Sequence, residues 1–204
     1  SFQVRCRRFD SDHPLSIVTN MKNFIEVYDN ALPLEHCDEI ITYFESSSRM
    51  ERGKTGAGVD LSKKNSWDIY NRFRNNTPVD CMIRDAIVKN LDDYKNKNPE
   101  INTLRYWALR NSYNIQKYFP GGGYFTPHCE QSSAEFGDRL IVWMIYLNTV
   151  TDGGGTNFPQ HDLITNAVAG RLVIWPAAWT HFHHGIVSET QIKYIATGWF
   201  SFLP

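Results

Sequence analysis

The sequence has few cysteines, and they follow no disulfide or metal-binding pattern. The chain of 204 residues contains four, far apart and without a CxxC pair: Cys6, Cys37, Cys81 and Cys129. Small disulfide-stabilised domains and zinc knuckles instead place cysteines at short, regular spacings. We therefore expect free thiols in a reducing compartment, which favours a cytoplasmic protein.

Long hydrophobic runs and a strong net charge are absent too. No stretch reaches the roughly 18 consecutive apolar residues of a membrane-spanning helix, and the N-terminal residues lack the apolar core of a signal peptide. The formal net charge is −1, although Lys and Arg together number 21. Such a chain has no global field that attracts nucleic acid or an anionic membrane, although a local basic groove stays open. We expect a soluble protein without a membrane partner and find no sign of a nucleic-acid partner.

The chain shows no internal repeat, and its length suits a single domain. Its first part, residues 1–104, is predicted to supply helical support and a mobile loop. A strand is expected at residues 23–28. Helices are expected at residues 34–44 and 78–95, where apolar side chains recur at helical spacing.

Residues 46–65 differ in character from their surroundings. The segment opens with three serines and continues with Gly53, Gly56 and Gly58 among charged residues, without a periodic apolar face. It is either a simple surface excursion or a functional loop, and long loops in compact domains are more often functional. We expect a mobile lid over a site.

From residue 105 onward the sequence is typical of β-structure. Short apolar or alternating runs recur, separated by Gly, Pro and Asn clusters, at residues 112–118, 139–147, 171–175 and 193–202. Helices followed by strands predict an α+β fold in which residues 105–204 form a jelly-roll core, a double-stranded β-helix, supported by the N-terminal helices.

Three side chains in this β-rich half have the pattern of a metal site. On a strand, residues two apart point to the same face, so His128 and Glu130 are able to reach one ion while Cys129 points away. A histidine-rich segment follows, with His183 standing 53 positions after Glu130. Two imidazoles and one carboxylate form the facial triad of non-haem iron(II) oxygenases. Taken alone the pattern is weak, because such a histidine is more often a satisfied polar residue.

Lys193 strengthens the hypothesis. In an extended segment, Lys193, Ile195, Thr197 and Trp199 share a face that is otherwise mostly apolar. Burying a lysine on such a face is unfavourable without an anion, although an edge strand with Lys193 in water is the alternative. A carboxylate of 2-oxoglutarate explains Lys193 better, with the Thr197 hydroxyl as a further contact.

Residues 114–200 resemble the catalytic domain of prolyl 4-hydroxylase-type, iron(II)- and 2-oxoglutarate-dependent oxygenases. The motifs that carry the resemblance stand in the family's order: Tyr118-Phe-Pro-Gly121 with Tyr124, Arg139 through Tyr146-Leu-Asn148, Gly153-Gly-Gly155-Thr156-Asn-Phe158-Pro159, Val168 through Trp175-Pro176, and Lys193 ten positions after His183. The residues before position 105 match only loosely.

The resemblance implies a function and a set of site residues. His128, Glu130 and His183 would hold iron(II) as the catalytic centre. Lys193 would grip 2-oxoglutarate, assisted by Tyr146 and Thr197, with Tyr118 in the pocket wall. Tyr146 and Tyr118 also read as ordinary core aromatics. Dioxygen would be the second co-substrate, with ascorbate as a supporting reductant.

The choice of His183 as the second imidazole ligand depends on this resemblance. His181 and His183 are expected on the same strand face, and His184 on the other. His183 is followed by His184-Gly185, as in the family's His-x-Gly, and only His183 gives the ten-residue offset to Lys193. His181 is then expected to orient a ligand or contact substrate.

The substrate implied is a peptidyl residue such as proline. The alternatives are an oxygenase for a free amino acid, another small metabolite or a nucleobase, and a non-catalytic ligand-binding module of the same fold. One departure from the family matters, because the usual His-x-Asp is here His128-x-Glu130. This form resembles a phage-type branch, and the alternative is a degenerate, poorly metallated site. The retained Tyr146, His183 and Lys193 favour an active enzyme.

Overall fold

The computed structural model describes residues 22–204, so Cys6 lies outside the described part. Its helices are α1 (Leu34–Ser46) and α2 (Pro78–Lys97), with short 3-10 turns at Phe73–Asn75, Pro99–Thr103, Ala134–Phe136, Pro159–His161 and Trp179–His181. Its strands are β1 (Glu26–Tyr28), β2 (Glu51–Arg52), β3 (Trp67–Arg72), β4 (Trp107–Tyr118), β5 (Arg139–Tyr146), β6 (Thr156–Phe158), β7 (Leu163–Thr165), β8 (Leu172–Pro176), β9 (His184–Gly185) and β10 (Lys193–Phe202).

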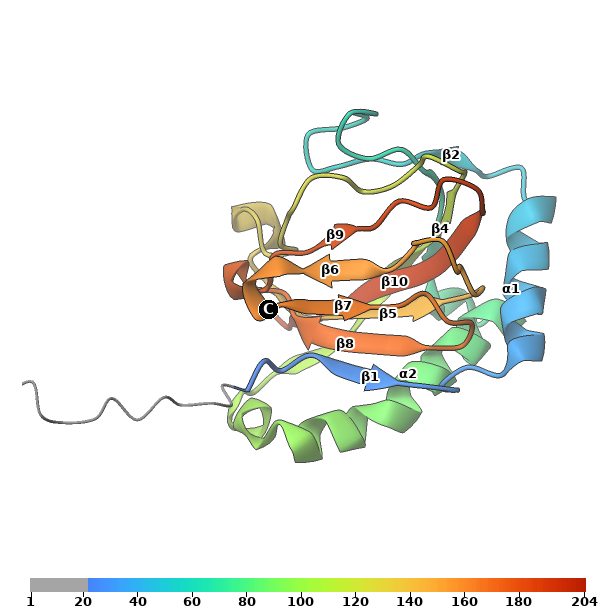
Figure 1. The fold of residues 1–204 in the computed structure, drawn as a ribbon. Coiled ribbons are helices and arrows are strands. Elements are labelled where there is room, and N and C mark those ends of the chain that lie inside the picture. The colour runs from blue at the N-terminus through green and yellow to red at the C-terminus, as the bar shows by residue number, and fades with distance from the viewer. Residues whose placement is uncertain (1–21) are drawn as a thin grey trace, which may run out of the picture.

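These strands form two antiparallel sheets that pack face to face. The large sheet has the order β1-β8-β5-β10-β4-β3-β2, and the small one has the order β7-β6-β9. Figure 1 shows the small sheet lying in front of the large one. Phe158 of the small sheet is buried in one cluster with Val142, Met144 and Trp175 of the large sheet. The predicted jelly-roll core is confirmed.

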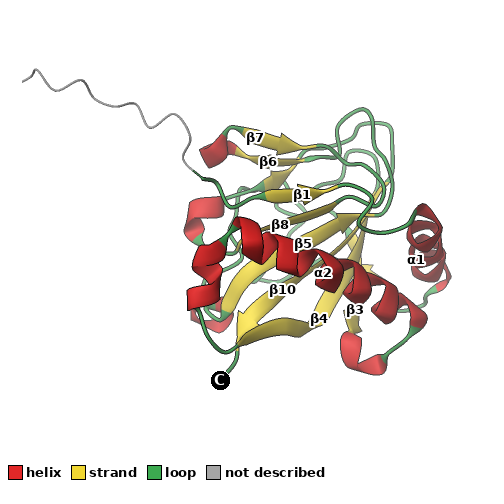
Figure 2. Cartoon of the chain, turned by 90° about the horizontal axis from the view of Figure 1, so that it is seen from below, coloured by secondary structure: helices red, strands yellow, loops and turns green. Residues whose placement is uncertain are grey.

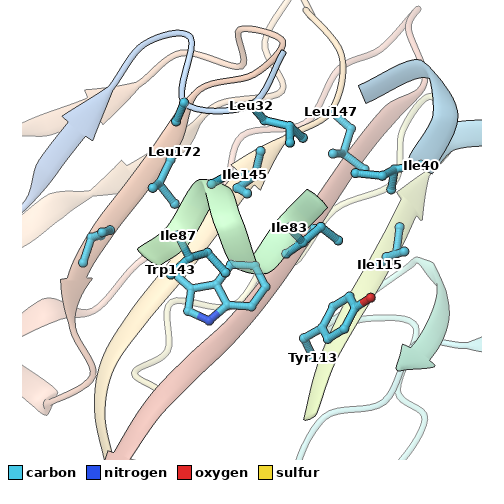
Figure 3. Packing of buried hydrophobic residues seen from close by; sticks show 14 of the residues in the cluster. Leu32, Ile40, Ile83, Ile87, Tyr113, Ile115, Trp143, Ile145, Leu147 and Leu172 are labelled. Carbon is cyan, nitrogen blue, oxygen red and sulfur yellow. The ribbon is translucent and has the colours of Figure 1, made fainter. Parts of the chain in front are cut away.

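Helix α2 covers the opposite face of the large sheet (Figure 2). Its start is fixed by a capping box, in which the Thr77 hydroxyl accepts from the backbone N–H of Asp80 and the Asp80 carboxylate accepts from that of Thr77. Ile83 and Ile87 of this helix are fully buried against the sheet, beside Trp143 (Figure 3). Each such side chain contributes about 1.5–3 kcal/mol to the free energy of unfolding.

The alternation along β5 and β10 separates this helix-packed core from the interior between the sheets. On β5, Trp143 packs toward α2, whereas Met144 lies in the interior cluster. On β10, Lys193, Ile195, Thr197 and Trp199 all line one interior cavity. The expectation that these four side chains share a face is confirmed.

The N-terminal half contributes more to the sheet than the sequence predicts. Strand β3 pairs with β4 along its whole length, and β1 and β2 add the two ends of the large sheet. Strand β1 begins three residues later than expected. The reason is local, since Phe24 has a left-handed φ of 57° and the Asn23 side chain accepts from the N–H of Ile25. Neither helix of the described residues is long and apolar enough to cross a membrane.

Candidate metal centre and its pocket

The structure brings His128, Glu130 and His183 together. Their potential ligand atoms all lie within 4.8 Å of one another. His128 and His183 face each other across an antiparallel bridge, with reciprocal backbone hydrogen bonds of 3.0 and 2.9 Å. Glu130 Oε1 lies 3.6 Å from His128 Nε2 and 3.7 Å from His183 Nε2. One carboxylate oxygen and two imidazole nitrogens therefore converge on one point.

Hydrogen bonds to the backbone fix both imidazoles. His128 Nδ1 lies 2.9 Å from the carbonyl oxygen of Thr126, and His183 Nδ1 lies 3.0 Å from that of His181. A carbonyl only accepts, so each Nδ1 donates to it, and each Nε2 is the ring nitrogen that faces Glu130. Burial lowers the pKa of His183, which favours the neutral imidazole. The donor set fits the facial triad of a non-haem iron(II) centre.

The sequence-based placement of His181 on a strand face shared with His183 is wrong. Residues 179–181 form a 3-10 turn, so the alternation of a strand does not apply. The buried His181 ring is within 2.7 Å of the Asn23 carbonyl through Nε2 and 2.9 Å of the Thr180 hydroxyl through Nδ1. Its side chain is thus engaged elsewhere, and only its carbonyl orients His183. His184 lies beside Asn157, away from the centre.

Glu130 Oε2 has partners that the sequence analysis did not identify. It accepts from Arg139 Nη1 at 2.8 Å and from Trp199 Nε1 at 3.1 Å. Arg139 opens β5, and Trp199 lies on the neighbouring β10. The only sequence signal was an arginine at the start of an apolar strand, which does not reveal a partner nine residues earlier.

The three converging groups face a cavity of about 540 Å³ that also contains Lys193. Lys193 is 5% exposed, and it forms no ion pair within residues 22–204. Its ammonium lies 4.7 Å from the ring centroid of Tyr118, the residue directly opposite on β4. Burial lowers the pKa of Lys193 to about 8. A buried cation without a carboxylate indicates an anion-binding position.

The space beside this ammonium is kept open by a glycine. A Cβ built on Gly185 would lie 3.5 Å from Lys193 Nζ. Tyr118 lines the same cavity, and its hydroxyl donates to Gln116 at 2.7 Å. Thr197 also lines it, while its hydroxyl donates to the carbonyl oxygen of Trp143 at 3.0 Å.

Tyr146 lies behind the cavity wall. It is fully buried, and its hydroxyl lies 2.8 Å from that of Thr156 and 3.0 Å from that of Thr165. Thr156 lines the cavity, whereas Tyr146 does not. A direct contact between Tyr146 and a ligand in this cavity therefore stays a prediction, with Thr156 standing between them.

A second buried lysine lines the cavity, and the sequence did not predict its place there. Lys64 is 3% exposed and pairs with Asp68 at 2.7 Å. Asp68 also accepts from Ser66 at 2.7 Å. Unlike Lys193, Lys64 has its counterion within the protein. The pair anchors the end of the 46–65 segment, because Lys64 lies in the loop and Asp68 lies on β3. A contact across such a loop-to-strand junction has no periodic pattern in the sequence.

Comparisons with known proteins agree with this geometry. Residues 113–201 match the profile of the 2OG-Fe(II) oxygenase superfamily. No curated protein sequence matches the chain at a significant level.

Three solved structures illustrate the shared fold. A viral collagen prolyl hydroxylase from Paramecium Bursaria Chlorella virus-1, in a 2-oxoglutarate complex, is 18% identical, with a TM-score of 0.63 over 88% of this chain and 97% of that one. A Pseudomonas putida prolyl-4-hydroxylase is 16% identical, with a TM-score of 0.66 over 89% and 94%. A Trichoplax adhaerens prolyl hydroxylase, bound to a peptide of hypoxia inducible factor, is 14% identical, with a TM-score of 0.69 over 88% and 84%.

The family match of residues 113–201 and the converging donor set together indicate an iron(II)- and 2-oxoglutarate-dependent dioxygenase. More particularly, the chain has the fold of the prolyl 4-hydroxylases. Its His128-x-Glu130 pair differs from the His-x-Asp pair of the family that the sequence resembles.

Proposed function

We propose that this enzyme hydroxylates a residue of a peptide or protein substrate, with proline the favoured residue. In this proposal His128, Glu130 and His183 hold iron(II), and Lys193 holds 2-oxoglutarate. The observation that carries it is the shared cavity, in which three converging metal-ligand side chains and a buried ammonium without an ion pair in residues 22–204 face one space. Tyr118 and Thr197 border that space, and we expect Tyr146 to act on the co-substrate through Thr156.

Each protein group has a defined task in this reaction. Bound iron(II) and 2-oxoglutarate supply the oxidising chemistry, in which dioxygen is consumed, 2-oxoglutarate loses carbon dioxide to give succinate, and one oxygen atom enters the substrate. His128 and His183 present their Nε2 atoms, and Glu130 presents one oxygen. Lys193 pairs with the distal carboxylate in a space that Gly185 leaves open. The apolar walls around Ile195 exclude water from the reacting groups.

The rim of the cavity supports a peptide rather than a fully enclosed small molecule. Part of the wall comes from the 46–65 segment, through Glu51, Arg52, Lys54, Thr55 and Gly56. Tyr70 stands at the same rim and is 53% exposed, and the rings of Phe136 and Trp199 also line the cavity. Aromatic surfaces pack well against a proline ring. The Trichoplax structure with a similar fold contains a bound peptide.

The test is a turnover assay that reports co-substrate and substrate together. The purified chain, with iron(II), 2-oxoglutarate and ascorbate, is incubated with prolyl peptides, free amino acids and oligonucleotides in parallel. We expect succinate in amounts that match the gain of one oxygen atom by a prolyl peptide in the mass spectrum. The His183→Ala variant should give neither product. Oxidation of a free amino acid or a base instead would replace the peptide proposal, and absence of any turnover would favour a non-catalytic module.

We also propose that the enzyme acts in the cytoplasm. The cysteines within the described residues, Cys37, Cys81 and Cys129, form no disulfide, which suits a reducing compartment. Expression of a fluorescent fusion in the native cell, followed by fractionation, tests this. Recovery in an oxidising compartment would contradict it.

A further inference from the structure

Two side chains of the large sheet donate hydrogen bonds to the Glu130 carboxylate oxygen that faces away from the two imidazoles. Arg139 Nη1 donates to Oε2 at 2.8 Å, and Trp199 Nε1 donates to the same oxygen at 3.1 Å. The other oxygen, Oε1, faces the two imidazoles. The two oxygens of one carboxylate thus have separate partners.

Arg139 is itself held in place by rings. Its guanidinium lies 4.2 Å from the ring centroid of Phe136 and 3.8 Å from that of Trp199. Its Nε is buried and has no hydrogen-bond partner. The Arg139 side chain is 13% exposed, and its one ion pair within the described residues is with Glu130. A buried guanidinium with a single anionic partner and two aromatic rings close to it has a restricted orientation.

A glutamate needs such a restraint more than an aspartate does. Its additional methylene adds one rotatable bond, so a free Glu130 would lose more conformational freedom on binding a metal. A free carboxylate is also able to chelate an ion through both oxygens and occupy a further coordination position. Engaging Oε2 elsewhere prevents this and leaves that position for the co-substrate.

We propose that Arg139 and Trp199 are positioning residues that make Glu130 a single-oxygen metal ligand. These two hydrogen-bond donors to Glu130 Oε2, here called the clamp, allow glutamate to serve at this position. The inference rests on the proposed metal role of Glu130. It predicts that metal affinity depends on both residues in the absence of any substrate. It also predicts that this dependence disappears when residue 130 is shortened, because an aspartate ends one methylene further from the Trp199 indole.

The experiment measures cobalt(II) binding by calorimetry and visible absorption, without substrate, in the parent chain and in folded variants verified by circular dichroism. Arg139→Gln should weaken binding by roughly 10- to 100-fold, the usual effect of removing a partner of a metal ligand. Trp199→Phe keeps a ring and removes only the N–H, so a smaller loss of about threefold to tenfold is expected. At saturating metal, both variants should change the cobalt(II) spectrum as Glu130 gains a second bond.

A matched control is Arg110→Gln. Arg110 is a nearby guanidinium that pairs with Asp138 at 2.8 Å and does not contact Glu130. Its loss should leave cobalt(II) affinity unchanged. The Glu130→Asp variant should retain metal binding, and adding Trp199→Phe to it should change affinity by less than about twofold, since the coupled pair no longer exists.

The possible outcomes separate the clamp from the metal centre. If the parent chain binds no metal, the proposed centre and the clamp both fail. If the parent binds and Arg139→Gln and Trp199→Phe bind equally well, the clamp fails, and an effect confined to substrate KM would make both residues substrate contacts. Equal losses from Trp199→Phe with Glu130 and with aspartate at position 130 would also overturn the clamp.

Discussion

At the scale of single residues, we expect Lys193 to determine the affinity for 2-oxoglutarate. A charge-assisted pair in a sheltered pocket is worth about 1.5–3 kcal/mol. We predict that Lys193→Ala weakens 2-oxoglutarate binding by roughly ten- to over a hundredfold, at 1.4 kcal/mol per decade. Iron affinity should change little. Titration of the metal-loaded enzyme with 2-oxoglutarate checks this, and unaltered affinity would refute the assignment.

The pH dependence of binding provides an independent check on the same residue. Burial lowers the pKa of Lys193 to about 8 in the free protein, and a bound carboxylate raises this pKa again. Below pH 8 the ammonium is already charged, so affinity is at its maximum. Above pH 8 binding must take up a proton, so we expect affinity to fall as the pH rises. Lys193→Arg, which stays charged, should lose this dependence; a profile that stays flat from pH 7 to 10 in the parent chain would contradict the account.

Gly185 tests whether the space beside Lys193 is used. A Cβ at this position would lie 3.5 Å from Lys193 Nζ, an ordinary contact distance that requires no displacement of the protein. We predict that Gly185→Ala folds with nearly parental thermal stability but binds 2-oxoglutarate at least tenfold more weakly, because the methyl group occupies space that the carboxylate needs. Parental affinity in a folded variant would show that the co-substrate lies elsewhere.

Sequence reasoning reached the residues whose position follows from strand alternation. The face of Lys193 follows from the period of two along β10. His128 and Glu130 do come together, but they lie in an isolated bridge and a bend rather than in the expected strand. The expected strand position of His181 is wrong because residues 179–181 form a 3-10 turn, which interrupts the strand alternation. No Gly or Pro within these residues indicates the turn. The Arg139 and Trp199 contacts depend on which strands become neighbours, which no single sequence shows.

At the scale of elements, the helices were more predictable than the strands. Both begin at the expected residues and continue two residues beyond the expected ends, since helix termini carry weaker signals than helix interiors. Strand β3 was missed because its sequence, Trp67–Arg72, mixes aromatic, charged and amide residues instead of alternating cleanly. Its role is set by pairing with β4, which is a tertiary effect.

The 46–65 segment has anchored ends and an irregular middle. Residues 51–52 pair with β3, Lys63 and Asn65 hydrogen-bond to the backbone of residues 123–125, and Lys64 pairs with Asp68. Between these anchors Val59 and Leu61 are 53% and 49% exposed. Exposed apolar side chains on a segment that lines the cavity with other residues suit a lid that a substrate covers.

We therefore predict that residues 53–62 exchange amide hydrogens quickly in the free enzyme and slowly with a peptide substrate bound. Replacing them with a short Gly-Ser linker should spare iron and 2-oxoglutarate binding, because the anchors remain, and should impair peptide hydroxylation. Full hydroxylation by that variant would show an ordinary surface loop. Hydrogen exchange followed by mass spectrometry, together with the turnover assay, provides both measurements.

At the scale of the whole molecule, two sheets and one covering helix place every proposed site residue in a single interior. The jelly roll was predictable from helices followed by short strands. The extent of the large sheet was not, because β1, β2 and β3 join it from the N-terminal half. This arrangement brings the neighbourhood of Lys64, far from His128 in sequence, into the wall of the same cavity.

The most direct test of this account is a crystal structure grown without oxygen in the presence of iron(II) and 2-oxoglutarate. We expect the metal on His128 Nε2, Glu130 Oε1 and His183 Nε2, with Glu130 Oε2 still bound by Arg139 and Trp199. The distal carboxylate of 2-oxoglutarate should lie against Lys193, next to Gly185. A metal ion bound through the His181 ring, or a co-substrate carboxylate away from Lys193, would contradict the account.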